Sequence, residues 1–124
     1  MIMGQQFSST VLIVDDEDYI RALASAVLQE EGFDVLQAAS TSEALYLAST
    51  HEIDVLLTDL HMPGPMDGLQ LAAQIRTKAP LLHVIISSGD DESVANKDAI
   101  DAVFLPKPYR PHQLTGAVRA HFIG

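Results

Sequence analysis

Residues 11–16, VLIVDD, join four consecutive apolar residues to two aspartates. An unbroken apolar run of this length is typical of a strand that is buried on both faces, as strands of parallel sheets are. Residues 55–59, VLLTD, repeat the pattern and end at Asp59. The two stretches therefore predict buried parallel strands that end at acidic side chains.

Apolar runs alternate with amphipathic stretches five times along the chain, which predicts an α/β fold with a parallel sheet covered on both faces. The expected strands are Thr10–Asp15, Asp34–Ala38, Val55–Asp59, Leu82–Ser87 and Ala102–Leu105. The expected helices are Asp18–Glu30, one from Ser40 with Glu43 in a capping box, one after Asp67-Gly68, Asp90–Asp98, and one after Pro111. The fourth helix is mostly polar, and a segment with few buried contacts opens at low cost, as a switch element requires; the alternative is a poorly ordered surface helix.

The length of 124 residues fits a single domain, which we expect at residues 10–124 after a disordered lead-in at residues 1–9. The 17 acidic and 7 basic residues leave a formal net charge of −10, which argues against nucleic acids and anionic membrane surfaces as partners. The absence of cysteine excludes disulfides and thiol chemistry. The amino terminus lacks a basic leader, and no apolar run could span a bilayer, so we expect a cytoplasmic protein.

The aspartates at the strand ends predict a cation site. In open parallel α/β sheets the carboxyl ends of the strands meet at one edge, where ligands bind. Two unit charges about 4 Å apart repel by roughly 4 kcal/mol at an effective dielectric near 20, so Asp15, Asp16 and Asp59 would need protons or a cation. Carboxylate oxygens suit Mg²⁺ better than zinc. The alternative is that the acidic run 15–18 only favours the start of a helix through its dipole.

A hydroxyl and a lysine are expected near the same edge. Ser87 and Ser88 point to opposite faces of their strand, so only one of them can face the site. Lys107 stands between two prolines, which hold the segment extended and present the ammonium from a stiff backbone. A lysine is a compact point charge suited to phosphate or carboxylate, although an exposed surface lysine is the alternative.

Together these pieces resemble the receiver domain of bacterial two-component response regulators, in particular the single-domain, chemotaxis-regulator-like members. The matching stretches are IVDDE at 13–17, TDLHMPG at 58–64 with MDG at 66–68, SG at 88–89, and FLPKP at 104–108. The resemblance extends from about Thr10 to Phe122. It implies a flavodoxin-like, doubly wound sheet of five parallel strands in the order 2-1-3-4-5, with five helices.

The resemblance also implies roles for individual residues. Asp59 would be the phosphoacceptor. Mg²⁺ would be bound directly by Asp16, directly or through water by Asp15, and also by Asp59 and the backbone carbonyl of His61. We expect the ring of His61 to lie near the site without binding the metal, and the alternative is a solvent-exposed loop histidine.

Three further residues receive roles in the switch. Lys107 would pair with the phosphoryl group or with Asp59, and Ser88 would hydrogen-bond a phosphoryl oxygen after transfer. Phe104 occupies the position of an aromatic side chain that changes rotamer on activation. The surface formed by the fourth helix, the fifth strand and the fifth helix would then change shape.

The implied function is a phosphorylation-dependent signalling switch that catalyses only its own phosphorylation and dephosphorylation. Its phosphodonor would be a histidine kinase or a phosphotransfer protein, and its output would be contact with a downstream protein. A homodimer remains open, as does a receiver excised from a hybrid kinase or a longer regulator.

Three other readings compete with this function. A Mg²⁺-dependent phosphohydrolase with an aspartyl-phosphate usually carries a second acid two residues after the nucleophile, where this chain has His61. A flavodoxin-type FMN carrier needs a phosphate loop rich in Ser, Thr and Gly where this chain is acidic. A degenerate receiver that only binds protein would not need the full set of acidic, hydroxyl and lysine residues.

Overall fold

Five parallel strands form one sheet in the order β2-β1-β3-β4-β5 in the computed structural model, which describes residues 9–89 and 100–123. The strands are β1 Thr10–Val14, β2 Asp34–Ala38, β3 Val55–Asp59, β4 His83–Ser88 and β5 Val103–Pro106. The helices in the described ranges are α1 Asp18–Glu30, α2 Thr41–Thr50, α3 Gly68–Arg76 and α4 Pro111–Ile123. The predicted flavodoxin-like fold and strand order are confirmed.

Two of the predicted segments lie outside the described residues. These are the expected fourth helix at Asp90–Asp98 and all but the last residue of the expected lead-in at residues 1–9. The element labelled α4 is consequently the fifth helix of the prediction. No helix in the described ranges is both long enough and apolar enough to cross a membrane.

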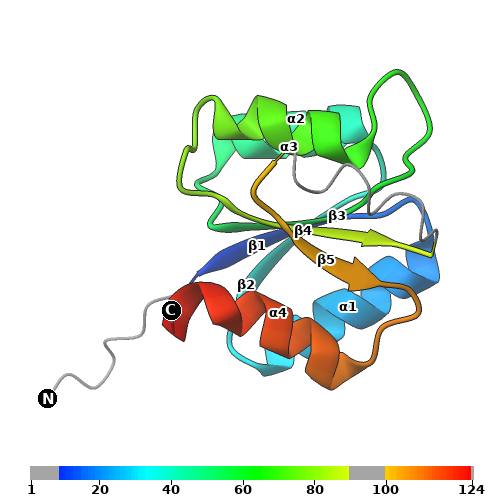
Figure 1. Cartoon of the computed structure of the whole chain (residues 1–124), viewed down its shortest axis with the longest axis vertical. Coiled ribbons are helices and arrows are strands. Elements are labelled where there is room, and N and C mark those ends of the chain that lie inside the picture. Colours follow the sequence, from blue (N-terminus) through cyan, green and yellow to red (C-terminus); the bar gives the residue numbers. More distant parts are fainter. Residues whose placement is uncertain (1–8, 90–99, 124) are drawn as a thin grey trace, which may run out of the picture.

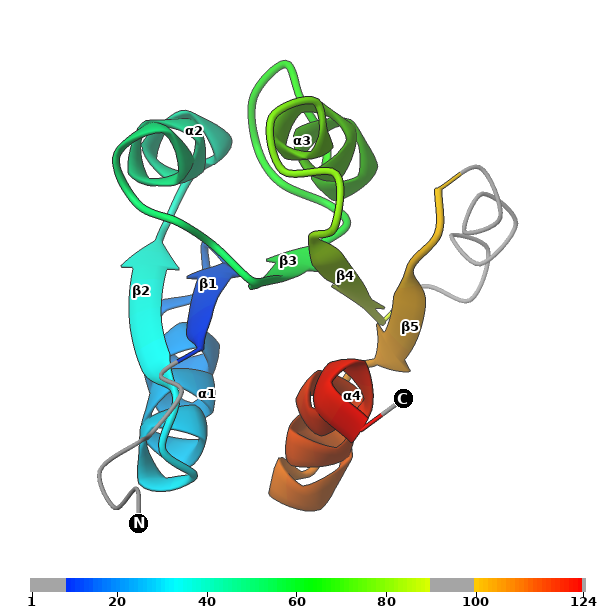
Figure 2. The same cartoon turned by 90° about the vertical axis from the view of Figure 1, so that its left-hand side faces the viewer.

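The sheet is the middle of three layers. Helices α2 and α3 cover one face, and α1 and α4 cover the other (Figures 1 and 2). Strand alternation divides the core accordingly. Leu12, Val14, Leu56, Val84 and Ile86 face α2 and α3, whereas Val11, Ile13, Leu57, Ile85 and Leu105 face α1 and α4. The side-chain period of two therefore predicts which residues reach each face at the carboxyl edge.

The start of α3 is held close to the end of β3. The Asp67 side chain accepts a hydrogen bond from the Gln70 N–H, and the Gln70 side chain accepts one from the Asp67 N–H, which completes a capping box. The Gly68 N–H donates to the carbonyl of Leu60 at 2.8 Å. A Cβ at Gly68 would lie only 2.3 Å from the carbonyl oxygen of Asp59, so only glycine fits here.

The capping box predicted at the start of α2 is only half formed. The Ser40 hydroxyl accepts from the Glu43 N–H at 3.1 Å, as expected. The Glu43 carboxylate, however, reaches the N–H of Ala39 instead of that of Ser40. Both bonds still satisfy backbone donors at the helix start.

Candidate functional site

Lys107 joins the acidic side chains at the carboxyl edge of the sheet. Its Nζ donates to Asp15 Oδ2 at 2.8 Å, to Asp59 Oδ2 at 3.0 Å and to Glu17 Oε1 at 3.4 Å. The Lys107, Asp15 and Asp59 side chains are 13%, 5% and 11% exposed. All three N–H bonds of the ammonium are therefore directed at carboxylates, two of which are almost completely buried.

The protonation of Lys107 follows from this arrangement. Burial by itself would lower the pKa of Lys107, because it disfavours the charged form. The hydrogen bonds and charges of Asp15 and Asp59 outweigh burial, and the pKa lies well above its usual range. The ammonium thus stays charged at physiological pH, as a fixed cation beside two carboxylates.

The carboxylates fit a divalent cation. Asp15, Glu17 and Asp59 each offer one oxygen atom, and these atoms lie within 4.8 Å of one another. Three negative charges face one ammonium, so the cluster retains a net negative charge that a dication would neutralise. The donors are all oxygen atoms, which is the set that Mg²⁺ prefers.

Glu17 belongs to this cluster, although the sequence pattern did not predict it. The Glu17 N–H donates to Asp15 Oδ1 at 2.9 Å, and this turn directs the chain so that Glu17 reaches Lys107. An aspartate that bonds the backbone two residues later is a known turn signal, and it could have pointed to Glu17. Asp16 was expected to bind the metal directly, but its side chain is exposed and lies outside the cluster. Its role as a ligand stays a prediction.

Asp59 is the last residue of β3, and the backbone that follows it holds it in place. Its Oδ1 accepts a hydrogen bond from the N–H of His61 at 3.2 Å. The next residue, Leu60, donates its N–H to the carbonyl of Ser87 on β4 at 2.9 Å. His61 is exposed next to the Asp59 carboxylate, and the predicted use of its carbonyl as a metal ligand stays a prediction.

Ser87 and Ser88 end β4 and are each 2% exposed. Ser88 follows Ile86 and so faces the α2 and α3 side of the sheet, where Phe104 packs against the core. The carbonyl of Ser88 accepts from the Lys107 N–H at 3.0 Å. Ser87 instead follows the row that faces α1 and α4. By strand alternation it is therefore Ser87 that shares the face of Asp59, and the predicted roles of Ser88 and Phe104 stay predictions.

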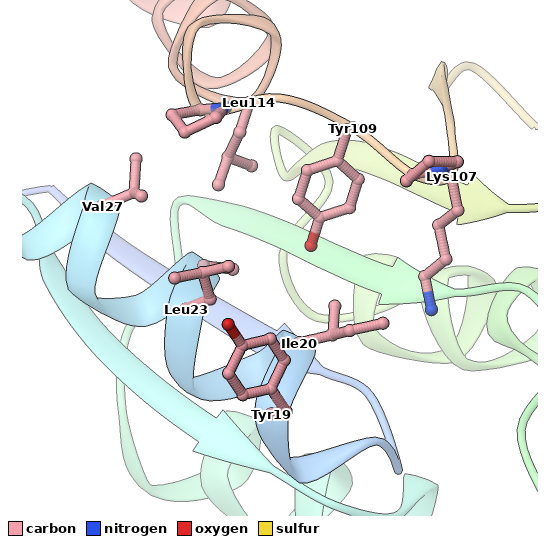
Figure 3. A pocket seen from close by; sticks show the side chains of 10 residues that line it. Tyr19, Ile20, Leu23, Val27, Lys107, Tyr109 and Leu114 are labelled. Carbon is pink, nitrogen blue, oxygen red and sulfur yellow. The ribbon is translucent and has the colours of Figure 1, made fainter.

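An apolar groove of about 220 Å³ runs between α1 and α4 and reaches Lys107 at one end (Figure 3). Helix α1 contributes Tyr19, which is 77% exposed, and Leu23, which is 51% exposed. Tyr109 and Leu114 line the other side. The helical periodicity of residues 18–30 predicts an apolar stripe but not this partial exposure, because exposure depends on where α4 packs.

Tyr109 connects the groove to the charged site. Burial, with a smaller contribution from the charge of Asp15, raises the pKa of Tyr109 to about 12. In Figure 3 the Tyr109 ring lies between Leu114 and the Lys107 side chain. A molecule in the groove would therefore lie beside the ammonium that holds Asp59.

The sequence matches the family described as the response regulator receiver domain over residues 11–119. It is 31% identical over 117 residues to the transcriptional regulatory protein YvrH of Bacillus subtilis and 31% identical over 115 residues to SrrA of Staphylococcus aureus. These matches cover 92% and 91% of this chain but 49% and 47% of the relatives. The chain thus spans about half the length of these curated relatives.

Solved receiver structures share the fold. The chemotaxis response regulator CheY4 of Vibrio cholerae superposes with a TM-score of 0.85 at 28% identity, covering 93% of this chain and 99% of that one. The receiver domain of the hybrid histidine kinase CckA gives a TM-score of 0.78 at 32% identity, covering 91% of this chain and 98% of that one. The family match, the strand order and the charged carboxyl edge agree, and the chain belongs to the response regulator receiver domains.

Proposed function

We propose that Asp59 accepts a phosphoryl group in a Mg²⁺-dependent reaction and that Lys107 stabilises the charge on the group during transfer. Receiver domains are signalling switches that bind Mg²⁺ at an acidic pocket and interact with histidine kinases or phosphotransfer proteins. The observation that carries the residue assignment is the pair of bonds from Lys107 to Asp15 and Asp59. These bonds join the proposed nucleophile Asp59, the Lys107 ammonium and a second carboxylate at one edge of the sheet.

The chemistry needs little from the protein beyond positioning and charge. An Asp59 oxygen would attack the phosphorus of a phosphohistidine, the P–N bond would break, and the freed imidazole would take up a proton. A Mg²⁺ ion would neutralise charge on the transferring oxygens. Asp15 and Asp16 would hold this ion with Asp59 and the His61 carbonyl. Lys107 supplies a positive charge close to the transferring group, since the ammonium contacts Asp59.

The product would act as an electrostatic switch. A phosphoryl group adds negative charge and strong acceptor oxygens beside Lys107 and Ser88. Movement of the Ser88 hydroxyl toward it would leave room for Phe104 to move inward. The surface at the expected helix Asp90–Asp98, β5 and α4 would then change and contact a downstream protein. The chain would turn over no substrate other than its own phosphoryl group.

Phosphorylation is tested with acetyl phosphate and Mg²⁺, with and without EDTA, followed by intact mass spectrometry. We expect one phosphoryl adduct that requires Mg²⁺ and is lost in Asp59→Asn. An adduct that persists in Asp59→Asn would refute the assignment.

The metal ligands are tested by Mg²⁺ titration of Asp16→Ala and Glu17→Gln. Asp18→Asn is the matched control, because Asp18 belongs to the same acidic run but is 86% exposed and pairs with Arg21. We expect Asp16→Ala to lose Mg²⁺ binding and the control to keep it. Loss in Glu17→Gln with retention in Asp16→Ala would instead assign the ligand to Glu17.

We further propose that the phosphodonor protein docks in the α1–α4 groove. The groove is apolar, it carries the exposed side chains of Tyr19 and Leu23, and it reaches the lysine that bonds Asp59, so a partner seated there would lie next to the proposed acceptor. Leu23→Lys should slow phosphotransfer from a purified kinase but leave phosphorylation by acetyl phosphate unchanged. Leu81→Lys is the control, since Leu81 is 87% exposed but precedes β4 at the opposite end of the sheet. Equal transfer to both variants would contradict docking in the groove.

A further inference from the structure

Ser87 carries a buried hydroxyl that the proposed chemistry does not use. The residue is 2% exposed, and within residues 9–89 and 100–123 its Oγ is the only buried side-chain N or O atom that lacks a hydrogen-bond partner. Buried hydroxyls are almost always hydrogen-bonded, because burial removes their bonds to water. Ser87 is therefore a candidate for a partner that it meets in another state of the site.

The sheet register places Ser87 beside the acceptor aspartate. Ser87 pairs with Asp59 on β3 and with Leu105 on β5, and neighbouring strands lie about 4.8 Å apart. Ile85 faces the α1 and α4 side of the sheet, and alternation directs Ser87 to that same face. Asp59 follows Leu57 in the same way, so the hydroxyl and the carboxylate are neighbours.

The path of Lys107 leads across Ser87. Lys107 follows β5, yet its ammonium bonds Asp59 on β3 and Asp15 after β1. Because β4 lies between β5 and β3, the Lys107 side chain must cross the end of β4. Ser87 is the last side chain of β4 that faces this side, since Ser88 points to the other face.

We propose that Ser87 is a positioning residue, whose hydroxyl accepts a hydrogen bond from the Lys107 ammonium when a divalent cation engages Asp15 and Asp59. This inference rests on the proposed function, because it requires the cation site. A dication at these carboxylates repels the ammonium and competes for the oxygens that it now contacts. The Ser87 oxygen has two free lone pairs close to the path of the lysine. It keeps the displaced ammonium inside the site, ready to meet the phosphoryl group.

The test uses two variants of nearly equal shape. Ser87→Thr keeps the hydroxyl and Ser87→Val replaces it with a methyl group, and both β-branched residues suit a strand. Mg²⁺ affinity is measured by isothermal titration calorimetry. We expect Ser87→Thr to bind like the wild type and Ser87→Val to bind about tenfold more weakly, the loss typical of one hydrogen bond to a charged group.

A second measurement follows the ammonium itself. The Lys107 ¹⁵Nζ resonance is assigned by its loss in Lys107→Met. With Mg²⁺ bound, its protons should stay protected from exchange with water in the wild type and in Ser87→Thr, and lose protection in Ser87→Val. A purely structural role of Ser87 would not separate the two variants in this way. Ser87→Ala, which only removes the hydroxyl, should behave like Ser87→Val and covers the case in which valine perturbs the strand.

The outcomes separate this inference from the proposed function. Equal Mg²⁺ affinity and equal protection in Ser87→Thr, Ser87→Val and Ser87→Ala overturn the role of Ser87 while the wild type still binds Mg²⁺ and takes a phosphoryl group. A wild type that binds no Mg²⁺ and forms no adduct with acetyl phosphate overturns both.

Discussion

Replacing Lys107 with methionine tests the charge balance of the site most directly. Methionine keeps an unbranched stem of similar reach but removes the ammonium. The buried oxygens of Asp15 and Asp59 lie within 4.8 Å of each other and would then face no countercharge. Coulomb's law gives a repulsion of about 3.5 kcal/mol for unit charges at 4.8 Å and an effective dielectric of 20. We therefore expect Lys107→Met to lose about 3 kcal/mol of unfolding free energy near neutral pH.

The dependence on conditions distinguishes charge repulsion from lost packing. Urea denaturation is followed at about pH 7 and about pH 5, with and without Mg²⁺. The deficit of Lys107→Met should shrink at the lower pH, because a proton on one carboxylate ends the repulsion. Mg²⁺ should stabilise Lys107→Met more than the wild type, because the ion replaces the missing positive charge and no longer competes with the ammonium.

Lys78→Met is the control for this experiment. Lys78 is an exposed lysine with no ion pair among the described residues, so its loss should change stability by no more than about 0.5 kcal/mol. The reasoning is refuted if Lys107→Met is as stable as Lys78→Met, or if its deficit is the same at both pH values and with Mg²⁺.

Three further predictions concern the surroundings of the site. Gly68→Ala would place a Cβ 2.3 Å from the Asp59 carbonyl oxygen. We therefore expect the free energy of unfolding, measured by denaturation, to fall by about 1–3 kcal/mol and the yield of phosphoryl adduct with acetyl phosphate to decrease. An unchanged adduct yield contradicts this prediction. Burial lowers the pKa of His83, whose Nε2–H donates to the Ala117 carbonyl at 3.0 Å. The folded state therefore favours neutral His83. The contribution of His83 to the free energy of unfolding is complete above the unfolded pKa of about 6.5 and is lost as the pH falls through the lower folded pKa. His83→Gln should therefore show a free energy of unfolding that varies less with pH across this range. Tyr109 should ionise near its pKa of about 12, at a higher pH than an ordinary tyrosine. The difference between the ultraviolet titration curves of the wild type and Tyr109→Phe measures this ionisation. Ionisation near pH 10.0 would contradict its burial.

Much of the fold was predictable because its signals are local. Consecutive apolar residues, helical spacing and helix-stopping glycine or proline each involve a few neighbours in the chain. The strand order then followed from the family resemblance, and the structure confirms it. The bounds of β2 and β3 match the prediction, whereas those of β1, β4 and β5 differ by one residue, as at Val14, where β1 ends before Asp15. The expected helix at Asp90–Asp98 lies outside the described residues and stays a prediction.

The site was predictable only where residues sit directly at strand ends. Asp15, Asp59 and Lys107 were expected to meet, and the structure brings them together. Glu17 was missed and Asp16 lies outside the cluster, because the turn after β1 decides which acid points inward.

The sequence by itself determined the sheet, its two apolar faces and the chemistry available at one edge, because these depend on residue type and on side-chain periods of 2 and 3.6. Only the tertiary structure decided which groups meet. The ammonium of Lys107 crosses a whole strand to reach Asp59, and the groove beside it exists because α4 packs against α1. Such contacts join residues far apart in the chain, and their geometry is set by packing among several elements at once.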